Sequence, residues 1–239
     1  MKLEKSIDHN RKTRGGEREM CQKIRELHGM THMDLLRKTN QLGAFPIDVA
    51  QICYEMGIRL MPFDFAPIEA KMQETGDSKG AIMGAIVAKG NDLAILYQKG
   101  DTVHGRRFTV AHEIAHSCLH MDPTEKIHME FRMAREQESP KEREANAFAR
   151  GLLIPSETLR MITNGATRVD AREVPMLAEK FMVSESTMRA RLGELEIEVT
   201  DTSADSGLES KLLFTDFGGA YSASGARAAS GSKPNFGAF

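Results

Sequence analysis

The chain has few cysteines, no long apolar segment and almost no net charge, and each shortage argues against a class of protein. Three widely spaced cysteines, Cys21, Cys53 and Cys118, indicate neither a disulfide framework nor a cysteine-rich zinc site. No apolar run approaches the roughly 18 residues of a membrane-spanning helix, and the charged start lacks the apolar core of a signal peptide. A formal net charge of −2 provides no general attraction to nucleic acid or membrane. We therefore expect a cytoplasmic protein without membrane contact.

Residues 112–116 read His-Glu-Ile-Ala-His inside a segment with a helical apolar pattern. Side chains four positions apart lie on one side of a helix, so His112 and His116 can direct two imidazoles at one metal ion. Glu113 then lies beside the water that the metal activates, as in zinc peptidases. The alternative is a pair of histidines on a polar helix face.

A catalytic zinc needs a third protein ligand. His120 cannot join both others, because eight residues of helix span about 12 Å along the axis. A second helix is predicted from Lys141 to Leu153, where Glu142, Ala145, Asn146 and Ala149 share a face. We predict that Glu142 is the third ligand and that Asn146 orients a ligand from behind. Glu144 lies about 200° around that helix, on the side expected to be solvated.

The segments RRFTVAHEIAHSCLH and EREANAFARGLLIP together resemble the paired signatures of ImmA/IrrE-type metallopeptidases. The likeness extends upstream to FPIDVAQICYEMGIRLMPFDF and GAIMGAIVAKGNDLAILYQKG, and covers roughly residues 31–195. It implies a single zinc held by His112, His116 and Glu142, with Glu113 as the general base for attack of water on a peptide bond. Members of this family act on DNA-binding repressors, which they cleave or inactivate.

The remaining pattern predicts an α+β fold with a helical zincin-like core and a small antiparallel or mixed sheet. We expect a helix at 31–43, a second beginning at Pro46, and strands at 58–65, 81–87 and 93–97. The predicted domains are a charged N-terminal arm at 1–30, a zinc metallopeptidase domain at 31–160, a helical segment at 161–199 and a low-complexity, disordered tail at 200–239.

The segment at 161–199 resembles a helix-turn-helix, with a turn at 182–184 and Ser184 capping the second helix. That second helix mixes Arg189 and Arg191 with Glu194 and Glu196, which is weak evidence for contact with phosphates. We therefore expect a packing or partner-docking module, and no direct DNA binding.

These features predict a zinc-dependent endopeptidase, with one Zn²⁺ per chain, that cleaves a helix-turn-helix repressor. Two alternatives stay open: an antirepressor that captures its partner without cleaving it, and a DNA-binding regulator. Glu113 favours the enzyme, since a structural zinc has no need of a base beside it. His104, His120 and Tyr97 are candidates for supporting a metal ligand or for stabilising the transition state, although His120 also fits a helix-surface or cleft-wall position. The sequence indicates neither the oligomeric state nor the activating signal.

Overall fold

The computed structural model describes residues 23–76, 81–89, 92–122, 127–133 and 139–201. Most of the predicted N-terminal arm and nearly all of the predicted tail lie outside these residues, as does Cys21. Within the described part of the chain, no helix is long and apolar enough to cross a membrane.

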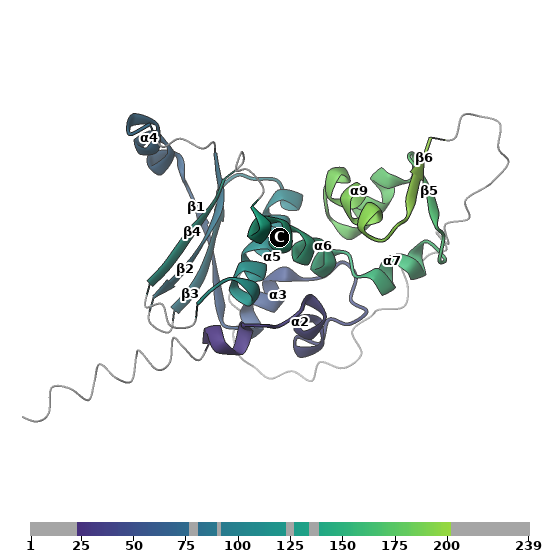
Figure 1. The fold of residues 1–239 in the computed structure, drawn as a ribbon, viewed down its shortest axis with the longest axis horizontal. Helices are drawn as coiled ribbons and strands as arrows, with labels where there is room; N and C mark the ends of the chain where they lie inside the picture. Colours follow the sequence, from purple (N-terminus) through teal and green to yellow (C-terminus); the bar gives the residue numbers. More distant parts are fainter. Residues whose placement is uncertain (1–22, 77–80, 90–91, 123–126, 134–138, 202–239) are drawn as a thin grey trace, which may run out of the picture.

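A four-stranded mixed sheet forms one layer of the molecule (Figure 1). Its strands are β1 (Ile58–Phe63), β2 (Ile82–Lys89), β3 (Asp92–Gln98) and β4 (Ile127–Met133), in the order β1-β3-β2-β4. β1 runs parallel to β3, whereas β2 pairs antiparallel with both β3 and β4. The predicted α+β class and mixed sheet are confirmed, but β4 was not foreseen from the sequence.

The long helix α5 (Val103–Leu119) packs on one face of this sheet, and α4 (Ala66–Glu74) lies against the other. The strand period of two divides the side chains between them. Ile86 and Ile95 join the core that contains α5, whereas Ala85 joins the small cluster packed by α4. α5 thus covers one face of the central strands, whereas α4 packs on a small part of the other, around Ala85 and Leu96.

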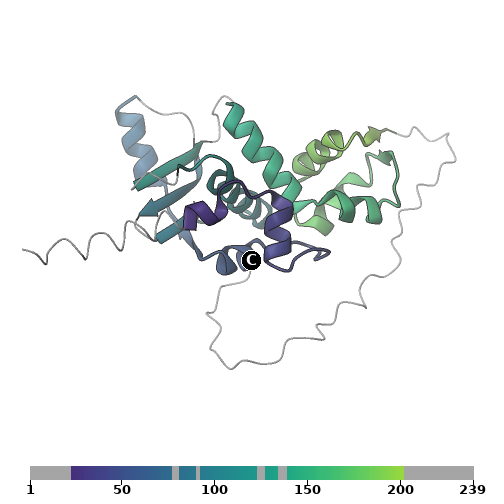
Figure 2. The ribbon, with the colours of Figure 1, turned by 60° about the horizontal axis from the view of Figure 1, so that its bottom comes forward.

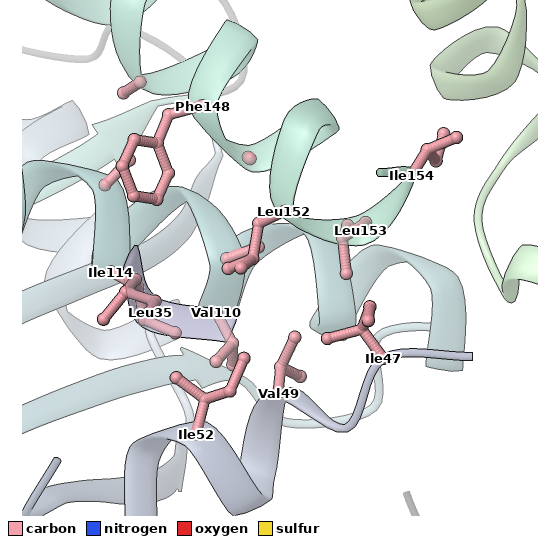
Figure 3. Packing of buried hydrophobic residues seen from close by; sticks show 14 of the residues in the cluster. Leu35, Ile47, Val49, Ile52, Val110, Ile114, Phe148, Leu152, Leu153 and Ile154 are labelled. Atoms are coloured by element: carbon pink, nitrogen blue, oxygen red, sulfur yellow. The ribbon is translucent and has the colours of Figure 1, made fainter. Parts of the chain in front are cut away.

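The main core lies where α5 meets α2 (His32–Lys38), α3 (Val49–Glu55) and α6 (Pro140–Leu153) (Figure 3). Aliphatic side chains from all four helices and the neighbouring loops are fully buried there: Leu35, Ile47, Val49, Ile52, Val110, Ile114, Leu152, Leu153 and Ile154. This shared core fixes α6 against α5, so residues on the two helices are held at a constant distance.

Two predicted helix boundaries were wrong. α2 ends at Lys38 and not near Gly43, because Asn40 leaves the helical region with a φ of 51°. α3 begins at Val49 and not at Pro46, because the carboxylate of Asp48 caps it by accepting hydrogen bonds from the amides of the second and third helical residues.

The end of the predicted N-terminal arm belongs to the core. Ile24 and Leu27 are each only 1% exposed, and the amide of Gly29 donates to the carbonyl of Cys118 at 2.8 Å. A segment whose charges suggested an arm therefore buries two aliphatic side chains against the end of α5.

The C-terminal part comprises α7 (Ser156–Ile162), α8 (Val174–Phe181), α9 (Glu185–Glu194) and a parallel strand pair, β5 (Arg168–Asp170) with β6 (Glu198–Thr200). Figures 1 and 2 show it beside α6, on the side away from the sheet. The predicted turn is present: Met182 adopts a left-handed conformation, and the Ser184 hydroxyl accepts from the Thr187 amide. The helix-turn-helix-like pair is therefore confirmed, whereas β5 and β6 were not foreseen.

Two buried arginines hold this C-terminal part against the rest of the chain. Arg107 of α5 donates to the carbonyls of Ile47 at 2.8 Å and Met182 at 3.1 Å. Arg191 of α9 donates to the carbonyl of Ile154 at 3.0 Å. The contacts join segments distant in sequence, so the position of α9 relative to α5 and α6 is determined by specific hydrogen bonds.

Candidate metal centre

The motif at 112–116 lies in the second half of α5, in the interior of the protein. Thr102 begins this helix by accepting a hydrogen bond from the amide of Gly105. The apolar spacing that predicted the helix turns one face to the sheet and another to α6. His112 is fully buried, Glu113 is 1% exposed and His116 is 2% exposed. Buried polar side chains at three such positions need partners, which α6 supplies in part.

α6 brings the predicted third ligand to the two histidines. Ser139 caps the helix by accepting from the amide of Glu142, and Pro140 occupies its first turn, where no amide donor is needed. Ala145 and Ala149 are fully buried on the side that faces α5, and their small side chains permit close approach. Glu142 consequently lies at the start of α6, directly over the histidine pair.

The three ligand atoms converge on one point. The Nε2 atoms of His112 and His116 lie 3.0 Å apart, and the Glu142 carboxylate lies 3.1 Å from the first and 3.2 Å from the second. Two bonds of 2.0–2.1 Å at a tetrahedral angle would separate their donor atoms by about 3.3 Å. Two imidazoles and one carboxylate are also a donor set that zinc accepts in peptidases. These residues could therefore hold a metal ion.

The surroundings of Glu142 favour its ionised form. Hydrogen bonds with His112, followed by those with His116, hold the pKa of this carboxyl well below its ordinary value, against the opposing effect of partial burial. A carboxylate that stays ionised is a competent metal ligand over the whole neutral range.

Each histidine has a second contact on its other nitrogen. The His112 Nδ1 lies 3.0 Å from the amide oxygen of Asn146, one turn after Glu142 on α6. The His116 Nδ1 lies 3.2 Å from the Nδ1 of His120. A ring that binds metal through Nε2 carries its proton on Nδ1, so His112 would donate to Asn146.

His120 and Glu144 contact each other, which the sequence did not indicate. The side chain of His120 is only 6% exposed, and its Nε2 lies 3.0 Å from the carboxylate of Glu144. Glu144 is 64% exposed, as expected for the outer side of α6, yet its carboxylate reaches back to His120. The expectation of a solvated side chain therefore holds for Glu144, whose carboxylate also contacts His120.

Glu113 lies between α5 and the sheet, beside Gly84 of β2. A Cβ atom added at Gly84 would come 3.5 Å from a carboxylate oxygen of Glu113 and would overlap the Thr109 side chain. Sequence reasoning did not single out Gly84. The feature that could have identified Gly84 is a glycine inside an otherwise apolar strand, because such a glycine often marks the close approach of another element.

The two other candidates for stabilising the transition state lie elsewhere. His104 is in the first turn of α5, about 12 Å along the axis from His112, and its Nε2 lies 3.7 Å from the carboxylate of Glu179. Tyr97 of β3 is 8% exposed and pairs across the sheet with Gly84. The structure therefore brings His120 to the histidine pair and puts Tyr97 in the core beside α5. It leaves His104 outside the metal cluster, the group formed by His112, His116 and Glu142.

A cleft of about 470 Å³ lies on the Nδ1 side of His112, away from the point where the ligand atoms converge; Glu113 and the three ligands are not part of its wall. Asn146, the partner of His112, is part of its wall, so the cleft reaches the back of the first ligand. The rest of the wall comes from β2, the start of α5, α6 and the start of α9: Met83, Thr102, His104, Gly105, Phe108, Arg150, Ser184, Ser186, Thr187 and Ala190. Its lining combines hydroxyl groups with the apolar side chains of Met83 and Phe108 and with His104 and Arg150.

Comparison with known proteins agrees with the ligand geometry. The model of the Peptidase_M78 family, described as an IrrE N-terminal-like domain, matches residues 53–193. The matched region contains His112, His116 and Glu142, the whole four-stranded sheet, and α9 except its last residue. No similar protein is found among the curated proteins. The match confirms the resemblance to ImmA/IrrE-type enzymes, and the chain belongs to the Peptidase_M78 family of metallopeptidases.

Proposed function

We propose that the protein is a zinc-dependent endopeptidase that cleaves a protein regulator, namely a helix-turn-helix transcriptional repressor. The observation that carries the catalytic part is the convergence of His112, His116 and Glu142 on one point, with the buried Glu113 on the same helix. The repressor as substrate is taken from the activity of the family. The same reasoning assigns the protein to the cytoplasm, where such a repressor is found.

The three ligands supply the metal site, and Glu113 supplies the proton transfer. A zinc ion held there would acidify a water molecule and polarise the scissile carbonyl. Glu113 accepts a proton from that water as its oxygen forms a bond to the carbonyl carbon. The carboxyl group holds the proton while the tetrahedral centre collapses, and then gives it to the nitrogen as the C–N bond breaks. The products are a carboxylic acid and an amine.

The cleft beside Asn146 is a suitable place for a part of the substrate away from the scissile bond, since Glu113 and the three ligands do not line it. Phe108 and Met83 offer apolar contacts, and the hydroxyl groups of Thr102, Ser186 and Thr187 can bond to a peptide. Its wall includes the start of α9, which in a DNA-reading helix-turn-helix would enter the major groove. A helix whose first turn lines a cleft shared with β2, α5 and α6 is better suited to contact a bound segment of protein. This arrangement supports a peptidase over a DNA-binding regulator.

A cleavage assay tests the proposal. A helix-turn-helix repressor, first of all one encoded beside the gene for this protein, is incubated with zinc-loaded wild type and with Glu113→Gln. The amide keeps the size of the side chain but cannot accept the proton, so cleavage should fall by about 10²–10⁴-fold while the metal is retained. Glu55→Gln, at an exposed position of α3, is the matched control and should cleave like wild type.

The same variants separate cleavage from capture. If Glu113→Gln relieves repression in cells as well as wild type does, proteolysis is not the function and a partner-capturing antirepressor takes its place. The same conclusion follows if the repressor binds the wild-type protein but is not cleaved by it.

A further inference from the structure

The Nδ1 atoms of His112 and His116, on the side of each ring away from the metal, contact different chemical groups. Behind His112 stands the neutral amide of Asn146, at 3.0 Å. Behind His116 stands the ring of His120, which is followed by the carboxylate of Glu144, at 3.2 Å and 3.0 Å respectively. His120 directly follows α5, one helical turn after His116, while Glu144 comes from α6. The chain of contacts therefore joins the same two helices that supply the ligands.

Only one arrangement of protons satisfies this chain when His116 binds a metal. The Nε2 of His116 faces His112 and Glu142, so it is the ligand atom and carries no proton. The His116 Nδ1 then carries the proton and donates to the Nδ1 of His120. His120 must consequently carry its own proton on Nε2, which is the atom that faces the Glu144 carboxylate. Every donor meets an acceptor.

We propose that His120 and Glu144 are positioning residues that hold His116 in its metal-binding tautomer and orientation. The inference rests on the metal site of the proposed function. The carboxylate at the end of the chain adds electron density to the imidazole of His116, which strengthens it as a ligand. Asn146 fixes the tautomer of His112 without that charge. The two ligands thus differ in strength, and His116 is the stronger.

His120 cannot bind the same metal ion as His112 and His116. The rise of the helix separates it from His112 by about 12 Å along the axis. Both ring nitrogens also have partners, His116 on one side and Glu144 on the other. The His120 ring is only 6% exposed and its contact with His116 is partly buried, and such a bond orients a neighbour more firmly than an exposed one does.

Zinc affinity is the measurement that tests this role. His120→Phe keeps the ring packed against His116 but removes the acceptor, and it should weaken zinc binding by about 10–100-fold in a chelator competition assay. Glu144→Gln keeps an acceptor for His120 but removes the charge, so its loss of affinity should be smaller, about three- to tenfold. His120→Gln offers His116 an amide oxygen, as Asn146 offers His112, and should recover part of the affinity lost in His120→Phe.

Cobalt substitution provides a readout of geometry. The visible absorption of Co²⁺ bound to His120→Phe should differ from that of wild type, because an unconstrained His116 ring changes the ligand field. Glu179→Gln is the matched control for Glu144→Gln, since it removes a carboxylate from a histidine, His104, that lies outside the cluster. His28→Phe, at an exposed histidine, is the control for His120→Phe. Both controls should bind zinc and cobalt like wild type.

The inference is overturned if His120→Phe and Glu144→Gln bind zinc within twofold of wild type with unchanged cobalt spectra. Glu144 is largely exposed, so its variant should fold and give an answer even if His120→Phe does not. A wild-type protein that binds no zinc would instead refute the proposed function. That failure appears before any variant is made, so the two outcomes are distinguishable.

Discussion

Thr109 of α5 packs onto Gly84 of β2 so closely that a side chain at position 84 would overlap the Thr109 methyl group. The carbonyl oxygen of Leu96 closes the other side, 3.1 Å from where a Cβ would lie. This contact sets the distance between the sheet and the helix that carries Glu113. A missing side chain on β2 is therefore what allows the buried carboxylate to lie beside the sheet.

Gly84→Ala should destabilise the protein by about 1–3 kcal/mol, because it overpacks this contact. Thr109→Ser removes the obstructing methyl group, so Gly84→Ala should cost less stability in the Thr109→Ser background than in wild type. Urea unfolding of the single and double variants measures the coupling. Gly193→Ala is the control: no atom lies within 4 Å of its Cβ position, and alanine in a helix should stabilise by about 0.5–1 kcal/mol. Equal costs in both backgrounds would contradict the argument.

Arg107→Met should destabilise the protein by about 2–4 kcal/mol in thermal or urea unfolding. The methionine fills much of the volume but leaves the carbonyls of Ile47 and Met182 without their donor, and each buried acceptor costs about 1–3 kcal/mol. Arg37→Met is the control, because its ion pair with Asp34 is exposed and contributes at most about 1 kcal/mol. Similar stabilities for the two variants would show that Arg107 does not anchor the C-terminal part.

Purified protein should contain one zinc per chain, since the described residues contain a single group of this kind. His112→Ala, His116→Ala and Glu142→Gln should each abolish stoichiometric binding, because two protein ligands do not retain a catalytic zinc. Elemental analysis after dialysis measures the content. His104→Ala, on the same helix but outside the cluster, should keep its metal. Full occupancy in any of the three ligand variants would refute that ligand.

Cys53 and Cys118 should be inert towards thiol reagents in the folded protein at pH 8. Both are buried, and burial raises the pKa of Cys118 to about 12 and that of Cys53 still further above its usual range. A raised pKa leaves the unreactive thiol form dominant until the pH approaches the shifted value. In a Cys21→Ser background, a chromogenic disulfide should label no thiol before denaturation and two after it. Rapid labelling of the native protein would contradict the burial.

Sequence reasoning was strongest where function depends on spacing within one helix. The four-residue interval between His112 and His116 is enough to place both rings on one side of α5, whatever surrounds them. The phase of α6 likewise predicted that Glu142, Ala145 and Ala149 face the same way. The turn before α9 was predictable because Ser184 caps the helix locally.

Helix ends and edge strands were less predictable because they depend on partners. Asp48 caps α3 through its own carboxylate, and this moved the helix start three residues past Pro46. β4 forms by pairing with β2, and β5 forms by pairing with β6, so neither needs a strong local pattern. The burial of Ile24 and Leu27 inside a charged stretch also depends on a distant surface, the end of α5.

The sequence by itself determined the family, the α+β class and the residues expected to meet at the metal, because helical phase and a two-part signature are local properties. Only the tertiary structure decided that His120 and Glu144 lie behind His116. Glu144 points away from Glu142 on α6, yet a long side chain bends back to His120 once α5 and α6 are packed. It also decided that the first turn of α9 lines the cleft, through hydrogen bonds such as that from Arg107 to Met182. Contacts between residues 24 and 75 positions apart depend on how helices pack, which no local pattern encodes.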